Sequence, residues 1–133
     1  MPLNIDRGTR VGPGGAFLAP AMNRPNLTVL TEALADKVLI EQGRAMGVQY
    51  RRGGQVQTVR VRREVVVSAG SFQSPAILMR SGIGPAAALR ALGIAVQVDA
   101  PEVGRNLQEH ASVHSTWFVD LPTTNTLLAA WRM

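Results

Sequence analysis

The feature that most constrains the fold of this chain is a run of three valines, residues 65–67, that leads within a few residues to a glycine. A short β-branched run between polar residues is typical of a buried strand. Gly70 then allows the backbone to turn sharply, or a ligand to approach closely, at a point where a Cβ would intrude. We therefore expect a core strand followed by a tight glycine turn.

The residues after this turn predict a capped helix. Ser74 followed by Pro75 is the pattern of an N-cap and a first helical residue, and Gly82 is suited to terminate the helix. Strand, glycine turn and capped helix together place a ligand at the carboxyl end of a strand in α/β folds. The same unit is also ordinary α/β architecture without a ligand, so these residues alone leave both interpretations open.

The remaining sequence predicts a three-stranded antiparallel meander and a second helix. Alternating apolar and polar residues indicate that the middle strand is buried on one side, and Gly53-Gly54 supplies the positive φ angles of a tight hairpin. Pro85 is suited to open the second helix, which we expect to end at Gly93. The expected strands are residues 35–41, 44–51 and 55–61 of the meander, 27–31 parallel to 65–68, and the extended segments 94–98 and 111–119.

Composition excludes several classes of function. The 133-residue chain has no cysteine, which rules out disulfides, thiol catalysis and cysteine metal sites. Its two histidines, His110 and His114, have no acidic cluster nearby, so we expect no metal site. No run of about eighteen apolar residues occurs, and we expect no membrane span. The sequence also has no signal peptide, which says nothing about export if the true N-terminus is missing, so the location stays open and we favour the cytoplasm. The apolar fraction of 46% fits one globular domain with a modest core.

The net charge of +5 is spread along the chain. Thirteen of the fourteen basic residues are arginines, and the densest clusters, at residues 51–52 and 60–63, fall on or beside the expected hairpin strands. Nucleic-acid binding normally combines a basic patch with a recognisable module or stacking aromatics, and Tyr50 is the only tyrosine. We therefore expect solvated strand faces and no nucleic-acid partner.

Four blocks of the sequence resemble the glucose–methanol–choline (GMC) oxidoreductases, which are flavin enzymes that oxidise alcohols. The blocks follow the family's order and lie between residues 10 and 119, with Glu109 where aspartate is usual. They are residues 24–33, RPNLTVLTEA, which resemble "RPNL.V.T.A"; residues 44–50, RAMGVQY, which resemble "RA.GV.Y"; residues 70–84, which resemble the family's second signature; and residues 103–110, VGRNLQEH, which resemble "VG.NLQDH".

The resemblance implies an α/β fold, here an α+β fragment of a Rossmann-like domain that binds flavin adenine dinucleotide (FAD), with an antiparallel β-meander and short helices. Residues 1–119 would form a partial FAD-binding domain, and residues 120–133 the start of a truncated substrate domain. The family's GxGxxG turn does not occur in this chain, and its catalytic histidine would lie beyond Met133. We therefore expect an internal fragment of a longer enzyme, with no catalytic residue of its own and no activity in isolation.

The resemblance also implies which residues approach the cofactor. Ala35 falls where the family holds adenine with backbone groups, and Ala69 and Gly70 form the turn after the strand beside the same half of the cofactor. We expect Asn106 to cap the short turn of residues 107–110. His110 matches the structural "NLQDH" segment, so we expect a histidine satisfied by hydrogen bonds near the flavin and not the general base. In the alternative interpretation, Ala35 is an ordinary strand residue and Gly70 an ordinary turn glycine.

Two functions of different class follow. In the first, the complete enzyme passes hydride from the CH–OH group of a small-molecule alcohol to FAD, while protein groups orient the alcohol and remove its proton. In the second, the chain is a non-catalytic α/β remnant or interaction module without activity of its own. A GxGxxG turn and a histidine pair encoded on the two sides of this reading frame would decide for the enzyme.

Overall fold

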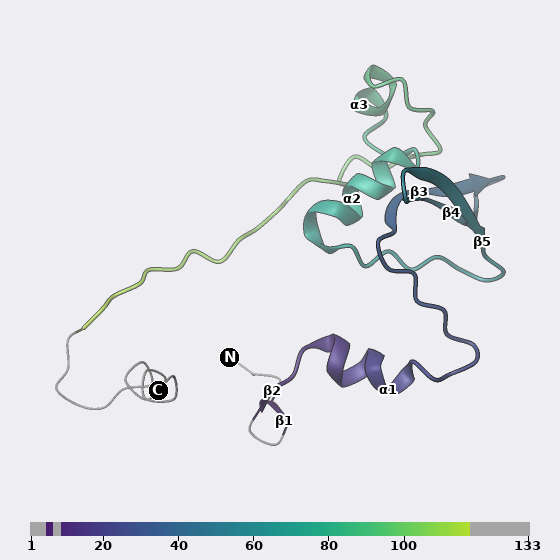
Figure 1. Ribbon diagram of the computed structural model, residues 1–133. Coiled ribbons are helices and arrows are strands. Elements are labelled where there is room, and N and C mark those ends of the chain that lie inside the picture. Colours follow the sequence, from purple (N-terminus) through teal and green to yellow (C-terminus); the bar gives the residue numbers. More distant parts are fainter. Residues whose placement is uncertain (1–4, 7–8, 118–133) are drawn as a thin grey trace.

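The fold is built on a three-stranded antiparallel sheet, seen in a computed structural model that describes residues 5–6 and 9–117 (Figure 1). Its strands are β3 (Leu34–Glu41), β4 (Arg44–Arg52) and β5 (Gln55–Arg60), in the order β3-β4-β5. Gly53 and Gly54 have φ angles of 56° and 77° in the second hairpin. The predicted meander is therefore confirmed, with boundaries that differ by one residue.

Two bulges shape this sheet. Asp36 is an extra residue on β3, because Ala35 pairs with Tyr50 whereas Lys37 already pairs with Gln49. Met46 is an extra residue on β4, and its carbonyl accepts a hydrogen bond from the Val61 N–H at 3.0 Å. A bulge interrupts the ladder and increases the local twist. The first of them turns backbone groups of the edge strand β3 toward the neighbouring helix.

That helix is α2 (Gly70–Arg80), and it starts earlier than the sequence predicts. The prediction of Ser74 as N-cap is wrong, because the helix continues one turn further toward the N-terminus. Instead, the Ser74 Oγ accepts a hydrogen bond from the Ala69 N–H at 3.0 Å, and Pro75 lies inside the helix. The end is as predicted: Gly82 follows the helix with a φ of 84°, and its N–H donates to the Met79 carbonyl at 2.9 Å.

A second small unit follows α2. The helix α3 (Ala86–Ala91) begins after Pro85 and is followed by Gly93 with a φ of 70°, as predicted. The Asp99 Oδ1 accepts a hydrogen bond from the Ala86 N–H at 3.0 Å. Two short strands, β6 (Ile83–Gly84) and β7 (Val98–Asp99), pair in parallel. The extended segment predicted for residues 94–98 is thus a strand only from Val98 onward.

The expected parallel strands at residues 27–31 and 65–68 are wrong as strands, because neither forms a ladder within the described residues. Residues 65–68 nevertheless keep the alternation of a strand. Val65 and Val67 are half-buried and line an apolar pocket with Val38 and Leu78, whereas Val66 is 76% exposed. The segment therefore packs one side as a strand would, but no strand among the described residues accepts its hydrogen bonds.

The two ends of the described chain lie outside this core. Strands β1 (Ile5–Asp6) and β2 (Thr9–Arg10) form a short hairpin, and the helical turns η1 (Gly14–Leu18) and α1 (Ala19–Ala21) follow it, away from the sheet (Figure 1). The predicted strand at residues 111–119 is wrong over residues 111–117, which are exposed and irregular. The predicted start of a second domain, residues 120–133, lies outside the described residues.

The hydrophobic core is small and lies around α2 and α3. Its buried apolar side chains are Val38, Ile77, Ala86 and Leu89, of which Leu89 is fully buried. Among the residues that the structure describes, no helix has the length and apolar character needed to cross a membrane. The mixed α/β class is confirmed, with its parallel component reduced to the pairing of β6 with β7.

Candidate cofactor site

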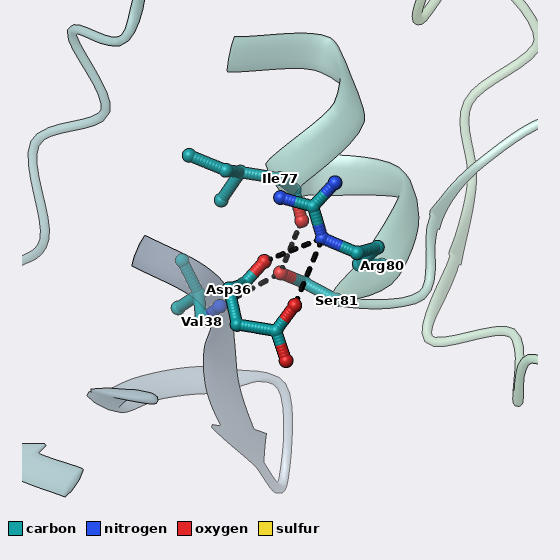
Figure 2. A network of polar contacts seen from close by, with 5 residues as sticks. All are labelled: Asp36, Val38, Ile77, Arg80 and Ser81. Atoms are coloured by element: carbon teal, nitrogen blue, oxygen red, sulfur yellow. Dashed lines mark hydrogen bonds and ion pairs between the residues drawn. The ribbon is translucent and has the colours of Figure 1, made fainter. Parts of the chain in front are cut away.

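A polar network fixes the C-terminal end of α2 to the edge of the sheet (Figure 2). The Ser81 Oγ accepts a hydrogen bond from the Val38 N–H at 2.8 Å and donates one to the Ile77 carbonyl at 2.6 Å. The Arg80 Nε donates to the Asp36 carbonyl at 2.8 Å and lies 3.1 Å from the Asp36 Oδ1. The network covers the edge of β3 and supplies partners for backbone groups that the ladder leaves unused.

The predicted cofactor residues lie at different distances from this network. Ala35 is half-buried on β3, next to the bulged Asp36 that Arg80 holds. Ala69 and Gly70 lie at the opposite end of the eleven-residue helix. At 1.5 Å per residue, the helix separates its two ends by roughly 15 Å. The structure therefore places Ala35 and Gly70 near opposite ends of one rigid element.

The turn at the start of α2 has the backbone that the sequence predicts. Gly70 has a φ of 86°, a value that residues with a side chain rarely adopt. A Cβ built on Gly70 would meet no atom within 4 Å. Glycine is therefore required here by the backbone angle and not by crowding, and the space beside it is open. Both Ala69 and Gly70 are exposed. The first N–H groups of a helix have no intrahelical acceptor and can donate to an anionic group.

A groove runs beside this turn, between α2 and the chain after α3. Its volume is about 400 Å³. Gly104 has a φ of 81° and packs beside the helix, where a Cβ would be in ordinary contact with the Met79 Sδ at 3.6 Å. Phe72 is 72% exposed at the groove. The lining residues are Ser71, Phe72, Pro75, Ala76 and Met79 of α2, and Gly104, Arg105, Asn106 and Leu107 of the later segment.

The groove contains one predicted site residue and several that the sequence reasoning missed. Asn106 lines it together with residues of α2. Phe72, Pro75, Ala76 and Met79 were not predicted to line a site, although their spacing of three and four residues marks them as one face of a helix. That spacing was a usable signal once the helix was known to start at Gly70.

Asn106 does not have the capping role that was predicted for it. Residues 107–110 form no turn, so there is no helix end for the Asn106 side chain to cap. Asn106 instead adopts a φ of 56°, which asparagine tolerates better than most residues, and its Nδ2 donates to the Glu102 Oε2 at 2.7 Å. The amide oxygen of Asn106, an exposed residue, has no hydrogen-bond partner among the described residues and keeps its capacity to accept one.

His110 is exposed, and its imidazole makes no hydrogen bond within the described part of the chain. Only its backbone N–H is bonded, at 2.9 Å from the Glu109 Oε1. The predicted set of partners around this imidazole is therefore not formed by residues 5–6 and 9–117. No cluster of three or more metal-binding side chains occurs in the same residues.

Comparison with known proteins relates this arrangement to one family. The family model described as "GMC oxidoreductase" matches residues 1–112. An oxygen-dependent choline dehydrogenase of Sinorhizobium fredii is 48% identical over 125 residues, which cover 94% of this chain and 22% of that protein. A protein with the same description from Photobacterium profundum is 45% identical over 124 residues, or 93% of this chain and 22% of its own length.

Solved structures similar to this chain are also oxidoreductases. A pyridoxine 4-oxidase from Mesorbium loti superposes with a TM-score of 0.68 and 34% identity, over 74% of this chain and 19% of that one. A fungal aryl-alcohol oxidase has a TM-score of 0.62 and 33% identity, over 68% of this chain and 16% of its own. The chain spans about a fifth of the length of the curated relatives that it matches.

Proposed function

The chain belongs to the GMC oxidoreductase family, and from this premise we propose that it is part of an FAD-dependent enzyme that oxidises the CH–OH group of a small-molecule alcohol. The observation that carries the proposal is the family match over residues 1–112, which includes α2, the Gly70 turn and the groove beside them. The relatives described above include a choline dehydrogenase, a pyridoxine oxidase and an aryl-alcohol oxidase. The compounds in these names, choline, pyridoxine and aryl alcohols, all carry an alcohol group.

The residues around the groove fit a dinucleotide cofactor. The Gly70 turn leaves open space for close approach, and the N–H groups at the start of α2 suit an anionic group. Phe72, Pro75 and Met79 offer an apolar wall, and the Asn106 amide oxygen offers an acceptor. FAD, when bound, supplies the acceptor for the hydride that leaves the alcohol carbon.

Within this proposal the chain's own residues bind and orient, and none of the described residues removes the alcohol proton. His110 and His114 are exposed, and neither imidazole is hydrogen-bonded to a carboxylate that would orient it as a base. We assign the binding role to Ala35, Ala69, Gly70 and Asn106, and we keep His110 as a residue near the flavin in the complete enzyme. A cytoplasmic location remains part of the proposal, and cell fractionation tests it.

A chimeric enzyme tests the proposed function. The matching 125-residue segment of the Sinorhizobium fredii choline dehydrogenase is replaced by this chain, and the purified protein is assayed for flavin absorbance and for choline-dependent reduction of a dye. We expect a yellow protein that oxidises choline, because this chain then supplies its part of the cofactor site.

The unmodified relative is the positive control, and a chimera that carries the segment in reversed sequence order is the negative one. A chimera that is folded by circular dichroism and monodisperse, yet colourless, would refute the assignment of this segment to the cofactor site. That result would favour the interpretation of the chain as a module without enzymatic function.

A further inference from the structure

A second concave site lies at the other end of the sheet, around the turn between β3 and β4. Its volume is about 450 Å³. One wall comes from this turn and the start of β4, and the other from the residues that follow β5. The Val61 N–H holds the two walls together through its hydrogen bond to the Met46 carbonyl. The lining residues are Glu41, Gln42, Arg44, Ala45, Met46, Val61, Arg62 and Arg63.

The charge of this pocket is unbalanced. Glu41 is its only carboxylate, and the Glu41 Oε1 is already engaged by Arg60 at 2.8 Å. Arg44, Arg62 and Arg63 form no ion pair with any described residue. Three exposed arginines therefore line one concavity, and the one acidic side chain beside them, Glu41, has one of its carboxylate oxygens engaged by Arg60.

Guanidinium groups have a planar arrangement of donors that matches phosphate and carboxylate oxygens in pairs. Several of them around one space favour a ligand with more than one anionic group, because a single charge leaves most donors unused. The pocket also has an apolar wall, made by Ala45, Met46 and Val61. Its volume is within the range of about 300–1,000 Å³ that is typical of small-molecule sites.

We propose that this pocket binds a small multivalent anion with phosphate or carboxylate groups, held by Arg44, Arg62 and Arg63. The pocket shares no lining residue with the groove beside α2. Ala35 and Glu41 lie near opposite ends of β3, and six residues of strand span roughly 20 Å. The proposal therefore does not depend on the proposed enzymatic function.

Binding of pyrophosphate and of citrate to the full 133-residue chain tests the proposal. The chain is kept at low micromolar concentration, and binding is followed by the increase in melting temperature and by titration calorimetry at constant ionic strength, with sodium chloride as the reference. We expect saturable binding of at least one of the two anions. Pyrophosphate alone would identify the phosphate class, and citrate alone the carboxylate class.

Two double variants separate a site from a general charge effect. Arg62→Gln with Arg63→Gln removes two charges from the pocket, and Arg51→Gln with Arg52→Gln removes two charges from the far end of the sheet. We expect the first pair to weaken binding at least about tenfold, since charged hydrogen bonds are lost, and the second pair to change it less than about twofold. Equal weakening in both, or no binding beyond that seen with chloride, would overturn the proposal.

Nuclear magnetic resonance of the unsubstituted chain, kept at the same low micromolar concentration so that the chain does not associate, gives an answer that does not depend on the folding of a variant. Addition of pyrophosphate or citrate should shift the Nε–H signals of Arg44, Arg62 and Arg63 and leave those of Arg51 and Arg52 in place. Shifts distributed over all the arginines would mean diffuse attraction by a basic protein, and the pocket would then be no binding site.

Discussion

At the scale of single residues, the hydroxyl group of Ser81 joins the two main parts of the core. It accepts the Val38 N–H from the sheet and donates to the Ile77 carbonyl of the helix, and it is only 7% exposed. A buried N–H without a partner costs more free energy than an average hydrogen bond contributes. The packing of α2 on β3 therefore depends in part on this one small side chain, beside the contacts of Arg80 with Asp36.

Replacement of Ser81 by alanine should consequently lower the free energy of unfolding by about 1–3 kcal/mol, because the Val38 N–H remains buried without an acceptor. Urea denaturation followed by circular dichroism measures the change. Ser68→Ala is the matched control, since Ser68 is exposed, and it should alter stability by less than about 0.5 kcal/mol. If both variants unfold at the same urea concentration, the Ser81 hydroxyl is not the link described here.

Some of these properties of single residues could be predicted from the sequence, and others could not. The turn at Gly70 and the helix ends at Gly82 and Gly93 were expected, because they follow from turn chemistry within a few residues, and all three glycines have positive φ. The role of Ser81 was not, because its acceptor bond connects residues 43 positions apart. The bond of Asn106 to Glu102 was missed for a different reason: the turn that Asn106 was expected to cap does not form.

At the scale of elements, prediction worked for the meander and failed for the parallel strands. In a hairpin, the strand that accepts the hydrogen bonds follows within a few residues. The glycine turns and the alternation of apolar and polar residues were therefore sufficient to predict the meander. Residues 27–31 and 65–68 carry the composition of strands, but a strand exists only if another strand accepts its hydrogen bonds. The start of α2 was predicted too late, because Ser74 serves the preceding turn through the Ala69 N–H rather than opening the helix.

The glycine turn before α2 provides a test at this scale. Gly70 and Gly93 both have positive φ, 86° and 70°, and a Cβ on either would meet no atom within 4 Å. Valine should therefore strain both backbones by a similar amount, but only Gly70 lies at the candidate cofactor site. In the chimeric enzyme, Gly70→Val should lower the flavin content well below that of Gly93→Val.

The measurement is the ratio of flavin to protein absorbance in the two purified chimeras, with circular dichroism to establish that both are folded. Equal flavin content in two folded proteins would remove Gly70 and Ala69 from the proposed site. The groove beside α2 would then need another occupant.

At the scale of the whole molecule, the apolar core is small for the length of chain. Four apolar side chains are buried among the described residues, whereas Val66, Phe72, Leu107 and Trp117 belong to a larger group of exposed ones. The relatives that the chain matches are several times longer. The division into residues 1–119 and 120–133 stays a prediction, and the buried core lies within the first of those segments.

We accordingly predict that the isolated chain neither oxidises alcohols nor retains FAD. Tight binding of the pyrophosphate uses the N–H groups behind a GxGxxG turn, and the sequence has none. No described residue serves as the base, a contribution that is typically about 10²–10⁴-fold in rate. The unpaired apolar segments should also favour aggregation at high concentration.

Purification of the 133-residue chain, followed by flavin absorbance, gel filtration and a dye-coupled assay with choline, checks all three parts of this prediction. The expected preparation is colourless, inactive and prone to associate. A yellow, monomeric and active protein would show that this chain is sufficient for a function that we assign only to a longer enzyme.

The attachment of α2 to β3 has a consequence for how this sequence can diverge. Ser81 and Arg80 form hydrogen bonds with the Val38 N–H and the Asp36 carbonyl. Both are backbone groups, so any residue other than proline can provide them. Exchange of the Asp36 side chain removes an exposed ion pair but leaves the carbonyl contact in place. Descendants of this chain can therefore vary the residue displayed at that bulge while the helix and the strand keep the same mutual placement.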